Sequence, residues 1–427
     1  MFDRSGRRYV RTFFTSPTAI DADDSAEMLR KASQLRGLQA PDVWVPDNED
    51  ATAPSMRDEG VENIIHVLTE HGAAFPGEIH PRVVWHRDDP MKRKQGYDHM
   101  RRLADPVAGA LEHLDGFVIP EVGHIDDWKK ADEFMTIIEH EHGLEEGRLD
   151  MSVIVESGQA ELALAELTDE MGKPTNNLER LFLLVDGEVD YTKDMKGMTP
   201  TGGLPPWPEL RHNTSRAASA VDLVAVDGPF DDIRNVEGYR ERMTENYAKG
   251  MLGIWSLTPA QVEIANTHPL PPVEGTYRFE TGAGEVELAS DGDLEVYDGE
   301  AFTVEDVGDG QYRIGDQLVS EEDLVGEVND RISYVPSLDD IVDSMEQFEE
   351  AKAAGRGAIS ISREATIRIG DVDVDIATDR MWDEATYQAA QTPIHLFQEV
   401  WETRPDQHDD FQEMYGEAVV NRALQVG

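Results

Sequence analysis

The sequence predicts a (β/α)₈ barrel followed by a small β-rich insertion and a C-terminal, mainly helical domain. Short apolar runs alternate with helical patterns throughout residues 1–272, which is typical of βα units around a parallel sheet. The alternation stops at the prolines of residues 269–272, where helix and strand are both disfavoured. Helical periodicity then returns beyond residue 336. We therefore expect three domains, at 1–272, 273–335 and 336–427.

Eight apolar runs in the first domain have the length and composition of strands. Most are followed by an amphipathic segment, such as 25–35 or 125–140, so each run and its segment form one strand-helix unit. Some of these helices carry a start signal, for instance Ser55 with Asp58 three residues later. Eight such units in about 260 residues predict a (β/α)₈ barrel. The expected strands are 9–14, 42–45, 78–85, 116–119, 151–155, 181–185, 223–226 and 251–255.

Beyond the barrel, the sequence changes character twice. The expected insertion is rich in Gly and Asp and contains short alternating segments, which favour strands and turns. Helical periodicity and one hairpin pattern follow it. The expected elements are strands 276–280 and 311–314, helix 338–353, a hairpin around 365–376 with Gly370 and Asp371 at its turn, and helices 384–402 and 407–423.

The chain is strongly acidic, because 87 Asp and Glu face only 38 Lys and Arg and give a net charge of −49. Such a surface repels nucleic acid and anionic membranes, so we expect neither as a partner. The acidic residues are spread along the whole chain. We interpret this as adaptation to molar salt, which would screen the self-repulsion, and we expect stability to rise with salt.

The sequence contains no cysteine. This excludes disulfides, thiolate nucleophiles, Cys-ligated zinc and iron-sulfur clusters, so any metal would be held by oxygen or imidazole. No stretch reaches about 18 apolar residues, and no apolar segment follows the charged N-terminus. We therefore expect a soluble, cytoplasmic protein.

Polar residues follow three of the expected strands, and a further set lies within the expected third strand; in a barrel, reacting groups lie where strands end and loops begin. Three of these sets are acidic and one is basic. Converging carboxylates repel each other unless a cation lies between them, and oxygen ligands suit Mg²⁺ or Mn²⁺. Capping of the next helix explains a single carboxylate equally well, whereas the complete set favours a metal site. The four sets are 46–51, 80–82, 156–158 and 186–190.

Six segments, in this order, resemble the successive motifs of the citrate lyase β-subunit and malyl-CoA lyase superfamily. A further segment, 248–262, resembles the last strand of that superfamily's barrel, which closes its CoA site. Each motif is short, so the ordered set carries the resemblance. The six segments are Arg7-Arg8-Tyr9-Val10, residues 47–54, His80-Pro81-Arg82, residues 118–122, Glu156-Ser157 and residues 187–191.

The C-terminal part resembles one branch of this superfamily. Residues 381–387 read Met-Trp-Asp-Glu-Ala-Thr-Tyr and are similar to the Met-Glu-Asp-x-Ala-Thr segment of malate synthases, in which the Asp is the catalytic base. The chain length and acidic composition resemble the short halophilic archaeal form, isoform H. Trp382 stands where the longer malate synthases have Glu, so contacts are carried over only at matched positions.

The resemblance implies a Mg²⁺-dependent condensation of acetyl-CoA with glyoxylate and hydrolysis of malyl-CoA to malate and CoA, as in the glyoxylate cycle. Asp383 would take the methyl proton, and Arg82 would stabilise negative charge on the reacting oxygens. Glu156 and Asp190 would bind Mg²⁺, with Mn²⁺ as a possible substitute. Asp383 is expected to be partly desolvated, which would raise its pKa.

Further positions have expected supporting roles. Backbone N–H groups at the loop after the sixth strand are expected to hold the glyoxylate carboxylate. The segment around the last strand is expected to contact CoA, although its tryptophan is an equally good core residue. Three carboxylates near Arg82 are expected to orient it and the metal-bound water. The substrate-binding candidates are Gly187, Val189, Asp190, Trp255 and Pro259, and the supporting ones are Asp47, Glu49 and Asp50.

Two other functions remain open. A malyl-CoA or citramalyl-CoA lyase of the same superfamily would keep the metal site and release the CoA ester reversibly, and such lyases can take a base from a neighbouring subunit. A non-catalytic barrel that binds acyl-CoA is disfavoured, because the base, the arginine and both metal ligands are all present. The family also implies a homo-oligomer built on trimers.

Overall fold

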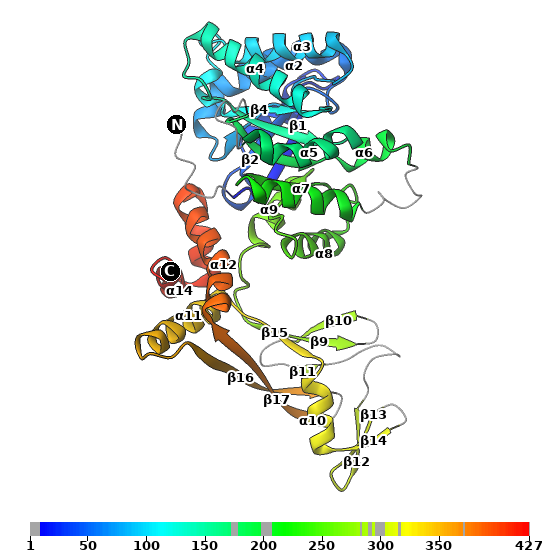
Figure 1. The fold of residues 1–427 in the computed structure, drawn as a ribbon, viewed down its shortest axis with the longest axis vertical. Helices are drawn as coiled ribbons and strands as arrows, with labels where there is room; N and C mark the ends of the chain where they lie inside the picture. The colour runs from blue at the N-terminus through cyan, green and yellow to red at the C-terminus, as the bar shows by residue number, and fades with distance from the viewer. Residues whose placement is uncertain are drawn as a thin grey trace. The chain divides into compact units, whose positions relative to one another are not determined.

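The computed structural model describes residues 9–426 except 172–177, 198–206, 282–283, 289–292, 295–303, 315–316 and 370–371. The chain forms two compact units (Figure 1). Unit 1 is Met1–Pro269 with Arg404–Gln407, and unit 2 is Leu270–Thr403 with His408–Gly427. The expected three-part division stays a prediction, since both of its C-terminal parts fall in unit 2.

Unit 1 is a barrel of eight parallel strands in the order β3-β2-β1-β8-β7-β6-β5-β4. β3 and β4 share no regular ladder. The barrel closes there through isolated bridges from Arg82 to Asp47 and to Val118. We call this junction the seam. The strands are β1 (Thr12–Pro17), β2 (Val43–Asp47), β3 (Glu78–Ile79), β4 (Gly116–Ile119), β5 (Asp150–Val155), β6 (Leu181–Asp186), β7 (Val224–Pro229) and β8 (Gly253–Ser256).

The strands are buried on both faces, which explains their continuous apolar runs. Every residue of β2, β4 and β6 is buried. Side chains alternate between the barrel interior and the helix layer. Phe13, Val45 and Val118 belong to the interior cluster, whereas Phe14 and Trp44 pack with residues of the helices.

Helices follow the strands and surround the barrel (Figure 1). Local signals start several of them: Asp89 accepts hydrogen bonds from the N–H groups of Met91 and Lys92, and Thr258 accepts one from Gln261. The helices are α1 (Glu27–Ser33), α2 (Arg57–His71), α3 (Pro90–Leu103), α4 (Ile125–His142), α5 (Gly158–Met171), α6 (Glu188–Asp194), α7 (Pro208–Ala220), α8 (Val236–Tyr247) and α9 (Pro259–Thr267), with 3₁₀ turns η1 (Gly37–Gln39), η2 (Pro54–Met56), η3 (Gly72–Ala74) and η4 (Leu111–His113).

The predicted barrel is confirmed, and each of the eight expected strands has a counterpart. The main difference is β3, which was expected over 78–85 but ends at Ile79. Pro81 follows and has no N–H to donate to a ladder. The N–H of Arg82 then donates to Pro46 at 2.9 Å, and the N–H of Val83 to Val118 at 3.2 Å. The chain therefore passes from one side of the seam to the other within a few residues.

Unit 2 combines small antiparallel sheets with helices. β9, β10 and β15 form one three-stranded sheet, β12, β13 and β14 another, and β11 adds to the β16-β17 hairpin. Ser320 and Ser337 form capping boxes at the starts of α10 and α11. The strands are β9 (Thr276–Thr281), β10 (Gly284–Leu288), β11 (Asp293–Leu294), β12 (Val304–Gly308), β13 (Gln311–Ile314), β14 (Gln317–Ser320), β15 (Ile332–Val335), β16 (Ala358–Ile369) and β17 (Val372–Asp383). The helices are α10 (Glu321–Asn329), α11 (Leu338–Ala353), α12 (Glu384–Thr403), α13 (His408–Tyr415) and α14 (Glu417–Ala423).

The β16-β17 hairpin is the longest strand pair of unit 2. Its register runs from Ala358 opposite Asp383 to Ile369 opposite Val372, so it extends well beyond the hairpin expected around 365–376. The expected turn at 370–371 lies outside the described residues. β17 leads directly into α12, and Asp383 therefore stands at a strand-helix junction.

Arg404–Gln407, which includes η5 (Pro405–Gln407), returns to unit 1. Arg404 pairs with Asp42 at 2.6 Å, and Arg11 donates to Gln407 at 3.1 Å and to Asp42 at 2.7 Å. These buried contacts join the segment to the start of the barrel strands. Within the described part of the chain, no helix has the length and apolar character needed to cross a membrane.

Candidate active site

Arg82 lies in the seam, where the carboxyl ends of the strands meet. Its side chain is 4% exposed. The Asp47 carboxylate accepts two hydrogen bonds from it, from Nε at 2.8 Å and from Nη2 at 2.5 Å. This paired geometry fixes the plane of the guanidinium. Asp47 is itself held by the N–H of Glu49 at 3.0 Å.

Two further carboxylates face the free end of the guanidinium. Arg82 Nη1 lies 3.6 Å from Glu49 and 3.4 Å from Asp50. Glu49 is buried, whereas the Asp50 side chain is 60% exposed. Burial, together with the nearby charge of Asp50, raises the pKa of Glu49 to about 8. The expected supporting carboxylates therefore do surround Arg82, and Glu49 gains a proton close to neutral pH.

Glu156 follows β5 and lies inside the barrel end. It is 4% exposed, and its Oε1 accepts a hydrogen bond from the N–H of Glu121. Glu121 has a φ of 48°, a conformation that is strained for a residue with a side chain. Burial raises the pKa of Glu156 well above its usual value, and the charges of Glu121 and Asp190 raise it further. A divalent cation bound here would offset the free-energy cost of burying the charged Glu156 carboxylate.

Gly187 brings β6 close to Glu156. A Cβ at this position would lie 2.5 Å from the Glu156 Cβ and 2.8 Å from Ile154 Cγ2, so no side chain fits without moving the carboxylate. The glycine is the N-cap of α6, which carries Asp190 in its first turn. Asp190 pairs with Lys193 at 2.9 Å.

The N–H of Gly187, which was expected to contact substrate, already has a partner within the barrel. The N–H of Gly187 donates to the carbonyl of Val155 at 3.1 Å, because β6 continues to Asp186 alongside β5. This N–H is therefore not available to a substrate carboxylate. The N–H groups of Val189 and Asp190 lie in the first turn of α6, where N–H groups lack intrahelical partners. The Val189 side chain is 51% exposed.

Trp255 is a core residue that also touches the site. It is 6% exposed and packs edge-to-face on Phe13 with ring centroids 5.3 Å apart. The Arg82 guanidinium lies 5.4 Å from the centre of its ring. Pro259 begins α9 and is exposed. Trp255 therefore stabilises the charge of Arg82 through a cation–π contact.

Arg87 is a residue that the sequence analysis missed. It pairs with Glu121 at 3.3 Å and with Asp194 at 2.5 Å. Asp194 also accepts a hydrogen bond from the N–H of Gly158 at 2.9 Å. Arg87 thus links Glu121 to the end of α6. The N–H of Glu121 contacts Glu156, and α6 carries Asp190, so Arg87 connects the surroundings of both proposed metal ligands. No short motif marks it, because its partners are far apart in the sequence.

A buried ion network lies behind α6 and was also missed. The two carboxylates, Glu188 and Asp227, are fully buried, and each pairs with two arginines, Arg211 and Arg242. The four contacts range from 2.5 to 3.1 Å. The first residue of α6, Glu188, therefore forms ion pairs with arginines of α7 and α8, and the same arginines pair with Asp227 of β7.

Asp383 lies in unit 2, and unit 1 holds the other candidates. It is exposed, and its Oδ1 accepts a hydrogen bond from the N–H of Thr386 at 2.9 Å. Hydrogen bonds from Thr386 lower the pKa of Asp383, which is opposite to the rise expected from desolvation. The reason is its place at the N-terminus of α12, where a carboxylate caps the helix.

The structure therefore brings most of the candidates together at one end of the barrel. Arg82 and Glu156 are both buried there, and Glu156 interacts electrostatically with Arg82 and Asp190. Glu156 and Asp190 provide oxygen donors, which suit a hard divalent cation. An arginine beside such a cation can polarise a carbonyl group and stabilise an enolate.

Comparison with known proteins agrees with this arrangement. Residues 22–258 match the HpcH/HpaI aldolase/citrate lyase family, and residues 277–388 match the malate synthase H C-terminal domain. The chain is 67% identical over 429 residues to a malate synthase of Haloferax volcanii, with 99% of each chain covered.

Two solved structures of the Haloferax volcanii malate synthase are also similar over the whole chain. A pyruvate/acetyl-CoA ternary complex gives a TM-score of 0.62 at 63% identity and covers 100% of both chains. A magnesium/glyoxylate complex gives a TM-score of 0.61 at 60% identity, again over 100% of both chains.

The barrel with its acidic strand ends and buried arginine is that of the HpcH/HpaI aldolase/citrate lyase family, and the chain belongs to this family. Within it, the second unit and the near-complete match place the chain in the malate synthase family.

Proposed function

We propose that the chain is a malate synthase, which condenses acetyl-CoA with glyoxylate and hydrolyses malyl-CoA to malate and CoA. The observation that carries this proposal is the grouping of Arg82, Glu156 and Asp190 at one barrel end, in a chain that is 67% identical to a malate synthase. The reaction needs a polarised aldehyde, a stabilised enolate and a base. The chain offers a residue for each task.

Mg²⁺ is the proposed cofactor, and Mn²⁺ is a possible substitute. Glu156 and Asp190 would hold it, because both are carboxylates and burial makes an unneutralised charge at Glu156 costly. When bound, Mg²⁺ would act as a Lewis acid toward the glyoxylate oxygens. Gly187 keeps room for the Glu156 carboxylate, and the backbone N–H of Glu121 fixes its orientation.

Arg82 would stabilise the negative charge that develops on the thioester oxygen and then on the aldehyde oxygen. Its paired hydrogen bonds to Asp47 hold the guanidinium before any substrate arrives, and preorganised donors of this kind lower a barrier without a reorganisation cost. Trp255 excludes solvent from one side of it. The N–H groups of Val189 and Asp190 would orient the glyoxylate carboxylate.

Asp383 is the proposed base for the methyl proton of acetyl-CoA. In the structure it is a solvent-exposed helix cap with a lowered pKa, which makes it a weak base. Loss of solvent and of the Thr386 hydrogen bond around bound substrate would raise that pKa and strengthen the base. This carboxylate belongs to unit 2.

Release of free thiol from acetyl-CoA tests the proposed function. The purified chain in molar KCl should release CoA and form malate only when glyoxylate and Mg²⁺ are both present. Treatment with a chelator should stop the reaction, and added Mg²⁺ should restore it. A malyl-CoA or citramalyl-CoA lyase would instead release no thiol and would cleave malyl-CoA to acetyl-CoA and glyoxylate, which would overturn the proposal.

The setting of the reaction is proposed on the family resemblance alone. We infer a role in the glyoxylate cycle, a cytoplasmic location and a homo-oligomer built on trimers. Light scattering in molar KCl would test the oligomer, because a trimer has three times the 427-residue chain mass.

A further inference from the structure

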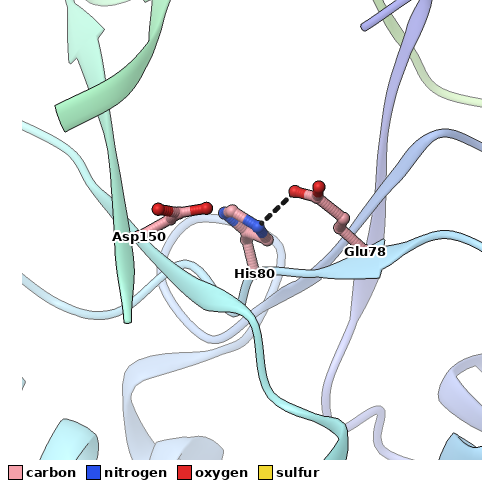
Figure 2. Close-up of side chains that lie close together, drawn as sticks. All are labelled: Glu78, His80 and Asp150. Atoms are coloured by element: carbon pink, nitrogen blue, oxygen red, sulfur yellow. Dashed lines mark hydrogen bonds and ion pairs between the residues drawn. The ribbon is translucent and has the colours of Figure 1, made fainter. Parts of the chain in front are cut away.

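A second group of metal-ligating side chains lies at the opposite end of the barrel from Glu156. Glu78 and Asp150 are the first residues of β3 and β5, and His80 follows β3. One donor atom from each of the three lies within 4.8 Å of the others. Figure 2 shows the carboxylates on either side of the His80 ring, with Nε2 3.0 Å from Glu78 Oε2. We call these three residues the lower cluster.

Strand periodicity explains why this cluster faces the barrel interior. Residues two apart on a strand point to the same face. His80 therefore points inward like Arg82, and Asp150 like Ile154, which belongs to the interior cluster. Asp150 and Glu156 therefore mark the two ends of β5, and His80 lies between the end of β3 and Arg82.

The His80 ring is held in place by its surroundings. It is fully buried, and its Nδ1 lies 3.5 Å from the hydroxyl of Ser152. The ring centroid lies 6.0 Å from that of Phe182. A histidine that ligates a metal through one nitrogen usually makes a polar contact through the other, which fixes its orientation. The contacts of His80 have this arrangement, with Nε2 directed toward Glu78.

The cluster also spans the weakest junction of the barrel. β3 and β4 share no ladder, and Arg82 bridges the seam at the other end. Glu78 and His80 lie on the β3 side of the seam, whereas Asp150 begins β5, beyond β4. A cation bound by all three side chains would therefore connect β3 to β5 across the seam, two residues away from Arg82.

We propose that the lower cluster binds a divalent transition-metal ion of the Zn²⁺ type, which links β3 to β5. One imidazole and two carboxylates form a set that Zn²⁺ accepts, whereas Mg²⁺ prefers oxygen ligands. Donors around one Zn²⁺ lie about 3.4 Å apart, given metal–ligand distances of about 2.0–2.2 Å. His80 Nε2 and Glu78 Oε2 are 3.0 Å apart, slightly closer than this spacing, and all three donor atoms lie within 4.8 Å of one another. Binding would therefore need only small side-chain adjustments.

A Zn²⁺ titration of the full chain tests this proposal. The metal-stripped protein is dialysed into molar KCl with saturating Mg²⁺, which occupies the proposed site at Glu156 and Asp190. Equilibrium dialysis should then find one Zn²⁺ per chain, and the midpoint of thermal unfolding should rise. Co²⁺ in place of Zn²⁺ should give visible absorption bands that report imidazole and carboxylate ligands.

Three variants distinguish Zn²⁺ bound at the lower cluster from Zn²⁺ bound elsewhere on the chain. Asp150→Asn should weaken Zn²⁺ binding at least tenfold while it keeps the pair of His80 and Glu78, and His80→Gln should abolish it. Asp190→Asn is the matched control, because it removes a ligand only at the other end and should leave this Zn²⁺ bound. The proposal is overturned if the wild-type chain binds no Zn²⁺ beside Mg²⁺, or if Asp150→Asn binds it as tightly as the wild type.

Discussion

Gly187 shows how little space surrounds the proposed metal ligands. The nearest atoms to a Cβ at this position all belong to Glu156 and Ile154, at 2.5 to 2.9 Å. Both residues are on or next to β5, which pairs with β6 through backbone hydrogen bonds. The backbone cannot retreat without breaking this ladder, so the Glu156 side chain would have to move.

Substitution of Gly187 by alanine should therefore weaken Mg²⁺ binding at least tenfold, which corresponds to about 1.4 kcal/mol. Isothermal titration of Mg²⁺ into the stripped chain measures this. Gly326→Ala is the matched control, because Gly326 lies in α10 with nothing within 4 Å of its Cβ position. It should leave Mg²⁺ binding unchanged and raise the free energy of unfolding by about 0.5–1 kcal/mol. Unchanged Mg²⁺ affinity in Gly187→Ala would contradict this account.

The sequence predicts the individual site residues well where they follow a strand. Glu156 was expected from this position, because the ends of parallel strands meet at one rim. Arg82 was expected within the third strand, and its role came from the family resemblance. The conformation of Glu121 and the lost N–H of Gly187 could not be predicted, since both depend on how neighbouring strands pair. Helix capping was considered for the carboxylates that follow barrel strands. It was not considered for Asp383, because the hairpin before this residue was expected to end earlier.

At the scale of elements, α6 is positioned by buried charge. Glu188 stands at its first residue, and Asp227 lies on β7. Both are fully buried, and Arg211 of α7 contacts them at 2.8 and 3.1 Å. Charges in such an environment are tolerated only when they are paired. The placement of Asp190 therefore depends on α7 and α8, which supply the two arginines.

Removal of one arginine from this network should be costly. We expect Arg211→Ala to lower the free energy of unfolding by about 3–5 kcal/mol, because Glu188 and Asp227 would each lose a buried partner. Urea denaturation at constant molar KCl measures this. Arg216→Ala on the exposed face of the same helix is the matched control and should change stability by less than about 0.5 kcal/mol. Equal effects of the two substitutions would show that the network does not hold α6.

The elements themselves follow from the sequence to different degrees. Continuous apolar runs identified all eight barrel strands, because both faces of each strand are buried. The length of β3 was overestimated because Val83, Val84 and Trp85 are apolar and buried without being in a ladder. The β16-β17 hairpin extends on both strands beyond the expected 365–376, and apolar Ile359 and Ile361 alternate with Ser360 and Ser362 in this extension. That alternation was in the sequence and was not used to set the bounds of the hairpin.

For the whole molecule, charge is the dominant property. With 87 acidic and 38 basic residues, the carboxylates outnumber the basic side chains by 49. Surface pairs such as Arg422 with Asp339, at 2.5 Å and half-exposed, contribute little individually and weaken in salt. The repulsion of a net charge of −49 weakens in salt as well, because the Debye length falls from about 10 Å at 0.1 M to about 3 Å at 1 M. The loss of repulsion in salt is a larger effect than the weakening of the surface ion pairs.

Stability should therefore rise with KCl concentration. The midpoint of thermal unfolding should increase between 0.1 and 1 M KCl, by about 1 °C for each kcal/mol of repulsion that is relieved, because the unfolding entropy of a 427-residue chain is about 0.9 kcal/mol/K. Calorimetry along a KCl series measures this, and sucrose at matched osmolality is the control because it does not screen charge. A midpoint that stays constant or falls in KCl would contradict the interpretation of the acidic surface.

The central proposal is that Asp383 supplies the base of the reaction and takes no part in binding Mg²⁺ or glyoxylate. The most direct test compares Asp383→Asn with the wild-type chain in the same molar KCl, by thiol release and by titration of Mg²⁺ and glyoxylate. The account predicts that kcat falls by about 10²–10⁴-fold, as expected for loss of a general base, while both affinities remain within about twofold of the wild type. Loss of Mg²⁺ or glyoxylate binding together with turnover, or turnover that persists, would contradict it.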